Sequence, residues 1–397
     1  MKTIDTLLQE VKELNEAEKY NEVIDILTED VLSLHNNADL YFQAGFALHL
    51  EYAHDKAFIY FDKAIERDQS QKDFFLHRGE VWHIKKEYDK AIADYNKALE
   101  LEPDCFITLN SRGNIWLEKM DHEKALADYD QAIALMPAEG EIYINRANTW
   151  LLQKDYARAE EDYNEGIRLN PSSVRAYRNR GDFWEERKEY DNAIKDYNKS
   201  IKLGNNSASI YLNRAVCWYK KRNNKKALAD IEQAIERDPN CALAYQNRAL
   251  CFSDKKEFKK AIIDLDKAIA LEPGNAGFYA LRGLTYNDMD HNKQALADLN
   301  KAVEIDAGLA TAYFGRASVW DDLGEHQRAI SNIDKAIEIA PDDLVYYIKR
   351  GTIWNNLKQY KKALADFDKA LEIDPENELA QELKAETKKK NMLTGFR

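Results

Sequence analysis

Apolar residues recur along the chain with the spacing of helices that come in pairs. Within residues 106–139, a first helical pattern gives way to a break near Asp121, and a second pattern ends at Pro137. The apolar positions are Leu109, Gly113 and Trp116 in the first segment and Ala125, Tyr129 and Ala132 in the second. A spacing of three or four residues predicts two antiparallel helices joined by a short turn.

The helix pair repeats with a period of 34 residues. All seven prolines share one 34-residue frame, and all seven tryptophans share another. Counting back from the prolines gives repeat starts at 38, 72, 106, 140, 174, 208, 242, 276, 310 and 344. We therefore expect a divergent helical repeat or cap in residues 1–37, ten tandem repeats in 38–377, and a capping helix with a tail in 378–397. One pair cannot bury both of its apolar faces, so neighbouring pairs have to stack into an all-α solenoid.

Each repeat resembles the tetratricopeptide repeat family. The shared features are an aromatic residue at the fourth position, Gly or Ala at the eighth and Trp or Tyr at the eleventh. In the second helix they are Ala at the twentieth, an aromatic residue at the twenty-fourth and Ala at the twenty-seventh, followed by Pro at the thirty-second. In 344–377 they are Tyr347, Gly351, Trp354, Ala363, Phe367, Ala370 and Pro375. The resemblance implies a right-handed superhelical α-solenoid whose first helices line a concave groove. The sequence departs from the family in the turns, because most repeats carry Lys or Arg where the family often places Gly.

Asparagines recur on one face of the first helices. At 100° per residue, the eighth and eleventh positions of a repeat lie within about 40° of the fourth, and the sixth position lies near 200° from it. Four successive repeats carry Asn at this sixth position, and two carry Asn at the ninth, which lies on the same face: Asn145, Asn179, Asn213 and Asn247, with Asn114 and Asn148. A carboxamide offers a donor and an acceptor to a peptide backbone. We therefore expect an extended peptide to lie along this face.

Side chains beside the asparagines indicate which peptide would fit. Aliphatic residues on the same face of adjacent repeats are Val216, Leu243, Leu250, Leu281 and Leu284, and acidic residues occupy the thirteenth position of several repeats. An apolar strip of this kind favours a partner, and the acidic edge favours a basic one. The expected ligand is a protein segment with aliphatic side chains and at least one Lys or Arg.

Arginine recurs at the seventh position in nine repeats, and eight of these also carry Asp at the twenty-third position. Folding the hairpin about its turn brings the two positions nearly level. We therefore interpret this pattern as a partly buried ladder of ion pairs that holds the repeats in register.

Charge and composition narrow the classes of partner. The 397 residues carry a formal net charge of -13, and such a surface repels nucleic acid and anionic lipid. The N-terminal segment lacks the apolar core of a signal peptide, so we expect a cytoplasmic protein. No phosphate-binding loop or nucleophile motif occurs, and we expect neither an enzyme nor a bound cofactor.

Two other kinds of site can be tested against the sequence, the family's carboxylate clamp and a metal site. Three positions of the family's carboxylate clamp are matched in register, by Asn114, Asn145 and Arg175. Asn110 and Asn179 occupy positions where the clamp has cations. A histidine-rich cluster lies nearer the N-terminus: His49, His77, Glu80 and His83. Its spacing differs from the i, i+4 pair of helical metal ligands, so no metal site is expected.

These patterns favour a non-enzymatic scaffold that binds extended protein segments through the asparagines and the apolar and acidic strips. The alternative is a regulatory or adaptor subunit whose groove holds a helix or folded domain of an enzyme, sensor or chaperone. The identity of the partner and the oligomeric state are not encoded in a recognisable motif.

Overall fold

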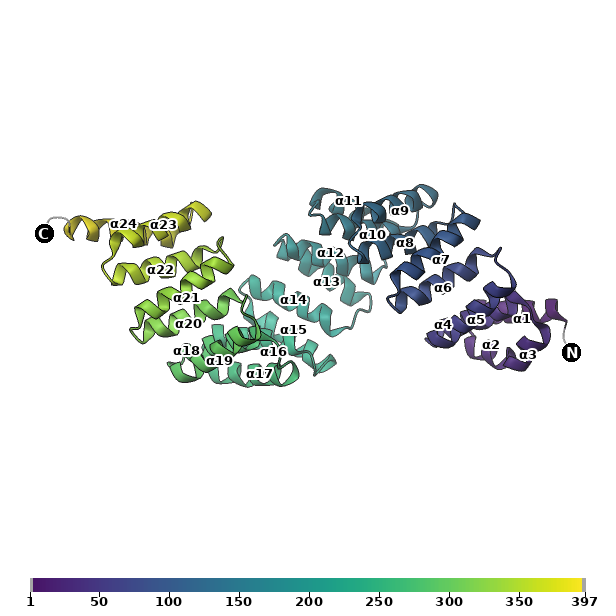
Figure 1. The fold of residues 1–397 in the computed structure, drawn as a ribbon, viewed down its shortest axis with the longest axis horizontal. Helices are drawn as coiled ribbons and strands as arrows, with labels where there is room; N and C mark the ends of the chain where they lie inside the picture. The colour runs from purple at the N-terminus through teal and green to yellow at the C-terminus, as the bar shows by residue number, and fades with distance from the viewer. Residues whose placement is uncertain (1–2, 395–397) are drawn as a thin grey trace. The chain divides into compact units, whose positions relative to one another are not determined.

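The computed structural model describes residues 3–394, and every regular element in that range is an α-helix (Figure 1). This confirms the predicted all-α fold of helix hairpins. The first helices of the pairs are α4 (Ala38–Leu50), α6 (Lys72–Ile84), α8 (Phe106–Glu118), α10 (Gly140–Leu152), α12 (Val174–Glu186), α14 (Ala208–Lys220), α16 (Ala242–Asp254), α18 (Ala276–Asn287), α20 (Ala310–Asp322) and α22 (Leu344–Asn356). The second helices are α5 (His54–Arg67), α7 (Tyr88–Leu101), α9 (His122–Leu135), α11 (Tyr156–Leu169), α13 (Tyr190–Lys202), α15 (Asn224–Arg237), α17 (Phe258–Leu271), α19 (Asn292–Ile305), α21 (His326–Ile339) and α23 (Tyr360–Ile373).

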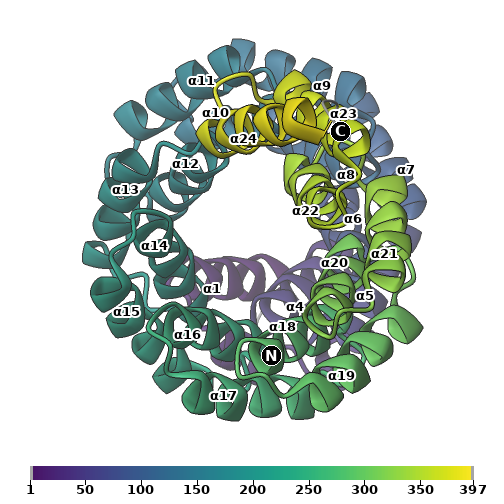
Figure 2. The ribbon, with the colours of Figure 1, turned by 90° about the vertical axis from the view of Figure 1, so that its left-hand side faces the viewer.

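The chain divides into two compact bodies. The N-terminal body is Met1–Arg187 with Asn198–Gly204, and the C-terminal body is Lys188–Tyr197 with Asn205–Arg397. Within each body the helices of a pair pack on each other and on the next pair. First helices of successive pairs also touch, as α8 and α10 do in one body and α14 and α16 in the other. In each body the first helices therefore form the inner side and the second helices the outer side (Figure 2).

Close approach of the two helices in a pair depends on small residues that face large rings. A Cβ atom added to Gly113 would lie 2.7 Å from Cε1 of Tyr129, and one added to Gly351 would lie 2.7 Å from Cε1 of Phe367. Both rings are fully buried. A ring on the second helix thus fills the space that the missing side chain of the first helix leaves.

The turns between paired helices keep a left-handed residue although most of them lack glycine. Lys154 has a φ of 60°, and equivalent residues in the other turns have φ between 58° and 61°, apart from Gly324 at 77°. The Asp155 N–H donates to the Trp150 carbonyl (2.9 Å) and the Lys154 N–H to the Leu151 carbonyl (2.8 Å). This is the Schellman pattern that ends a helix. The departure from the family sequence therefore leaves the turn geometry intact.

Replacing Lys154 with glycine is expected to raise the free energy of unfolding by about 0.5–1 kcal/mol. The left-handed conformation costs a side-chain-bearing residue about 1–2 kcal/mol, and part of that gain is lost to the greater freedom of glycine in the unfolded chain. The matched control, Gly324→Ala, should lower stability by a similar amount, because it places a Cβ at a φ of 77°. Urea denaturation followed by circular dichroism measures both, and a destabilised Lys154→Gly variant would contradict the argument.

The ends of the chain depart from the paired pattern. At the N-terminus one long helix precedes two short ones: α1 (Ile4–Glu16), α2 (Tyr20–Ile26) and α3 (Glu29–His35). At the other end α24 (Glu378–Thr394) packs on α22 and α23, where Ala380 and Leu383 join their core. Residues 395–397 of the expected tail lie outside the described range. Among the described helices, none combines the length and apolar character that crossing a bilayer requires.

Candidate peptide-binding surface

In the N-terminal body, the predicted asparagines lie on the inner helices α10 and α12, within a hydrogen-bonded network. Asn145 is 2% exposed, its Nδ2 donates to Oδ1 of Asn110 (2.8 Å), and its Oδ1 accepts from a guanidinium nitrogen of Arg175 (2.5 Å). Arg175 also pairs with Glu141. A peptide that reached Asn145 would have to displace these partners. The link spans helices α8, α10 and α12, so spacing within one helix could not reveal it.

Asn114 and Asn148 are held differently, by tyrosines of their own repeats. The Tyr129 hydroxyl donates to Oδ1 of Asn114 (2.8 Å), and the Tyr163 hydroxyl donates to Oδ1 of Asn148 (2.7 Å). Both tyrosine rings are fully buried, so they fix the orientation of the amides. The Nδ2 donors of both asparagines have no partner among the described residues, and both asparagines are partly exposed. This pairing is not predicted by the helical pattern of either helix, although both of its members recur 34 residues apart.

Asn179 completes the N-terminal group. It is 8% exposed, its Nδ2 lies 3.3 Å from Oδ1 of Asn148, and its Oδ1 accepts from Arg178 (3.3 Å). The structure therefore brings Asn145, Asn148 and Asn179 together on neighbouring inner helices. It leaves Asn114 and Asn148 as the more accessible donors.

In the C-terminal body, Asn213 lies on α14 and Asn247 on α16, both partly exposed. Nδ2 of Asn247 donates to the Leu243 carbonyl one turn earlier (2.9 Å), which leaves its Oδ1 directed away from that bond. The aliphatic residues lie on the inner helices α14, α16 and α18. Leu243 is 49% exposed, whereas Val216, Leu250 and Leu284 are half-buried. Accessible apolar surface is thus present on three successive first helices.

The predicted ion-pair ladder is confirmed and is more extensive than the sequence suggested. In the repeat of Arg146, Nε and one terminal nitrogen donate to the two oxygens of Asp162 (2.7 and 2.8 Å). The other terminal nitrogen donates to Asp130 of the preceding repeat (2.6 Å). The same bidentate pairing occurs at Arg78, Arg112, Arg214, Arg248, Arg282 and Arg350. Each arginine is therefore committed to structure and does not offer its charge to a ligand.

The histidine-rich cluster forms hydrogen bonds within the protein. Nδ1 of His77 lies 2.7 Å from Oε2 of Glu80, and Nε2 of His49 lies 3.6 Å from the same oxygen. Burial acts to raise the pKa of Glu80, but the hydrogen bond and charge of His77 and the charge of His49 outweigh it and hold that pKa below its ordinary value. His83 pairs separately with Glu118 (2.8 Å). The four residues expected to form one cluster therefore form two.

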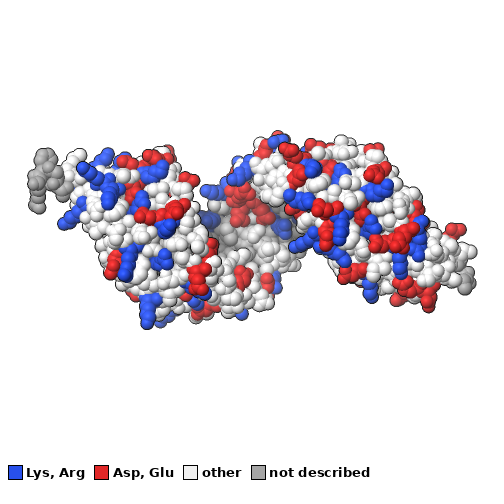
Figure 3. Space-filling model, in the orientation of Figure 1, with Lys and Arg blue, Asp and Glu red and all other residues white. Residues whose placement is uncertain are grey.

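Charge is mixed on the outer surfaces of both bodies, where blue and red side chains alternate on the face in view (Figure 3). The thirteenth-position acids are spread over the ends of several first helices. Burial, followed by the nearby charge of Asp322, raises the pKa of Asp288 on the edge of α18. The preference of this edge for a basic ligand stays a prediction.

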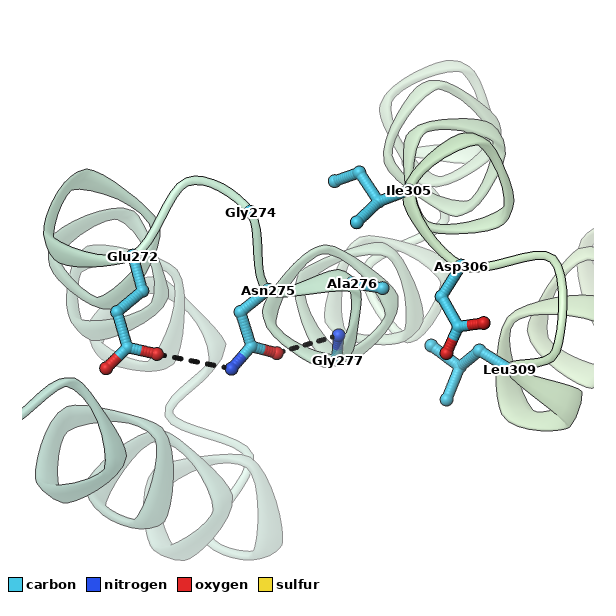
Figure 4. A pocket seen from close by; sticks show the side chains of 8 residues that line it. All are labelled: Glu272, Gly274, Asn275, Ala276, Gly277, Ile305, Asp306 and Leu309. Carbon is cyan, nitrogen blue, oxygen red and sulfur yellow. Dashed lines mark hydrogen bonds between the residues drawn. The ribbon is translucent and has the colours of Figure 1, made fainter. Parts of the chain in front are cut away.

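A cavity of about 640 Å³ lies between the loops that precede α18 and α20 (Figure 4). Its amide side chain, Asn275, donates to Glu272 (3.4 Å) and accepts from the Gly277 N–H (3.1 Å). The remaining lining consists of short or aliphatic residues and Asp306. Because Asn275 caps the start of α18, this cavity is explained by the local turn and holds no convergent set of ligand-binding groups.

Three family models, all described as tetratricopeptide repeat, together match more than half of the chain. The matched residues are 73–105 and 345–377 for the first, 112–173, 153–208 and 218–276 for the second, and 276–308 and 310–343 for the third. No curated protein matches the sequence.

Solved structures of similar fold extend over nearly the whole chain. The APC/C hetero-tetramer Cut9-Hcn1 has a TM-score of 0.52 and 12% identity, covering 96% of this chain and 89% of that chain. Yeast Tom70 has a TM-score of 0.51 and 15% identity, covering 98% and 96%. At these identities the likeness shows the fold alone.

Proposed function

Because this chain belongs to the tetratricopeptide repeat family, we propose that it is a non-enzymatic scaffold that binds an extended protein segment on the inner face of its first helices. The observation that carries the proposal is the pair of tyrosine-oriented amides at Asn114 and Asn148. Each presents its nitrogen donors where a peptide carbonyl can accept. The proposal does not require the buried Asn145 to leave its partners.

The spacing of the inner helices suits an extended ligand. Packed helices lie about 8–10 Å apart, and three residues of extended chain span about 10 Å. One amide per repeat can therefore meet every third residue of the ligand. Each such bond contributes about 0.5–1.5 kcal/mol, so a few of them, less the cost of ordering the peptide, support binding of micromolar order.

The second candidate is an adaptor that holds a helix or folded domain. The accessible aliphatic residues of the C-terminal body, above all Leu243 at 49% exposure, favour it. An amphipathic helix buries aliphatic anchors spaced three or four residues apart and uses few main-chain hydrogen bonds. The two candidates therefore differ in whether the amides or the leucines dominate binding.

Peptide display on the full-length chain, followed by fluorescence polarisation with a selected peptide, tests both candidates. We expect the Asn114→Ala/Asn148→Ala double variant to weaken binding at least tenfold, because it removes two oriented donors. Changing the exposed outer-helix amides Gln131 and Gln327 to Ala is the matched control and should leave the affinity unchanged. Unchanged affinity in the asparagine variant, with loss in Leu243→Glu/Leu250→Glu, would replace the first candidate by the second.

A further inference from the structure

A second, chemically different pocket lies at the N-terminal end of the inner face. It has a volume of about 500 Å³ and is formed by α1, the turn after it, α2, α4 and α6. Helices α1, α2 and α4 contact one another, and α4 contacts α6, so the walls belong to one packed group within the N-terminal body. The volume is within the range of small-ligand sites, about 300–1,000 Å³.

Aromatic rings form one wall of the pocket. Phe42, Phe46, Tyr20 and His77 line it, and all four are partly exposed. The ring centroids of Phe46 and His77 are 5.0 Å apart with an edge-on arrangement, and those of Phe42 and His77 are 5.5 Å apart. Accessible aromatic faces attract a cation that enters between them.

The charged groups of the lining favour the same kind of ligand. Glu16, Glu18 and Asp73 are exposed, and none forms an ion pair or side-chain hydrogen bond with another described residue. Lys12 and the His77 imidazole, which is hydrogen-bonded to Glu80, are the basic side chains of the lining, so three carboxylates outnumber the basic groups. Elsewhere on the chain most carboxylates of the inner and outer helices have a basic partner, as Asp162 and Glu141 do. Three carboxylates at one pocket without such a partner can pair with a charge that the ligand supplies.

Two buried amides add acceptors to the pocket. Asn15 is 7% exposed and Gln43 is 9% exposed. Nδ2 of Asn15 donates to the Gln43 carbonyl (3.3 Å) and to Oε1 of Gln43 (2.7 Å). The backbone carbonyl can only accept, which fixes the orientation of the Asn15 amide. Oδ1 of Asn15 is consequently left buried without a donor among the described residues.

We propose that this pocket binds a basic side chain, lysine or arginine, of a protein partner. Both side chains carry hydrogen-bond donors and no acceptor, which matches a lining that offers carboxylates, a Gln43 oxygen and an unsatisfied Asn15 oxygen. The aliphatic stem lies along Phe42 and Phe46, and the charged end pairs with Glu18 and Asp73. The pocket is separate from the asparagines of α8 to α12, so this inference goes beyond the proposed function and stands without it.

A ligand-observed NMR titration of the full-length chain tests the pocket. The probes are short glycine–serine peptides with one central lysine, arginine or norleucine. We expect the lysine and arginine peptides to bind at least tenfold more tightly than the norleucine peptide, and more weakly as salt is raised. Glu18→Gln/Asp73→Asn should weaken the binding of the basic peptides at least fivefold, because it removes the two carboxylates that pair with the charged end. Both residues are exposed, so the variant should still fold.

The control removes the same charge from the same region outside the pocket. Asp25→Asn/Asp30→Asn on α2 and α3 should leave the affinity within twofold of the wild type. Asn114→Ala/Asn148→Ala should also leave it unchanged, which separates this pocket from the proposed peptide surface. Equal binding of the norleucine peptide, or wild-type affinity of Glu18→Gln/Asp73→Asn, would overturn the proposal. Self-association that this double variant abolishes would assign the pocket to a second copy of the chain and would also overturn it.

Discussion

Replacing Arg146 with methionine is expected to lower the free energy of unfolding by about 3–5 kcal/mol. The change removes three charge-assisted hydrogen bonds, two to Asp162 and one to Asp130. Asp162 is 6% exposed, so its carboxylate would remain buried without a partner. Asp130 is exposed and can be solvated instead. The hydrogen bonds from Arg146 to Asp162 also raise the pKa of the guanidinium, which shows that the charged form is the one that the fold stabilises.

Urea denaturation and native-state hydrogen exchange measure this effect. Exchange should report the largest loss of protection in α9 to α11, because in a repeat array each repeat interacts mainly with its neighbours. Arg168→Met is the matched control: this arginine is exposed and pairs with Glu165 one turn away, so its loss should cost no more than about 0.5 kcal/mol.

The double variant Arg146→Met/Asp162→Leu separates the cost of burying an unpaired carboxylate from the net contribution of the ion pair to stability. It should recover most of the lost stability, because a buried ion pair replaced by apolar groups of similar size is often neutral. A double variant as unstable as Arg146→Met would mean that the pair itself contributes the stability, contrary to this account.

Replacing Gly113 with valine is expected to destabilise the protein by about 3 kcal/mol, near the upper end of the usual cost of overpacking. Even the Cβ alone would lie 2.7 Å from Tyr129, whose ring is fully buried and whose hydroxyl is anchored on Asn114. The ring cannot rotate away without breaking that hydrogen bond. Valine adds two further methyl groups at the same point.

Differential scanning calorimetry with a double-mutant cycle measures this second effect. In the Tyr129→Leu background the same glycine substitution should cost much less, because the ring that it meets is smaller. Gly274→Ala is the control: no atom lies within 4 Å of the added Cβ, so stability should be nearly unchanged. Additive effects of Gly113→Val and Tyr129→Leu would show that the two residues do not share the space as described.

The repeat pattern predicted most of the architecture because the same few contacts recur every 34 residues. Arg146 and Asp162 join the two helices of one repeat, so the spacing within a repeat was enough to predict their pairing. The contact between Gly113 and Tyr129 lies within one repeat as well, but its residues were recognised only as positions of the repeat pattern. The turns were less predictable, since Lys154 adopts the conformation for which the family often uses glycine. Backbone hydrogen bonds to Trp150 and Leu151 impose that conformation regardless of the side chain.

The candidate surface shows where sequence reasoning stops. A helical wheel placed the asparagines on one face, but it could not tell which amides are free. Asn145 is committed to Asn110 and Arg175, which come from the preceding and following repeats. Asn15 and Gln43 likewise meet only because α1 packs on α4, outside the 34-residue pattern.

The sequence by itself determined the helices, their pairing and the face on which each side chain emerges, because these follow from periodicity along one chain segment. Only the tertiary structure decided which polar groups are already satisfied and which remain available to a partner. That outcome depends on side chains that stacking brings together from different repeats, where differences of a few ångströms separate a hydrogen bond from an open donor.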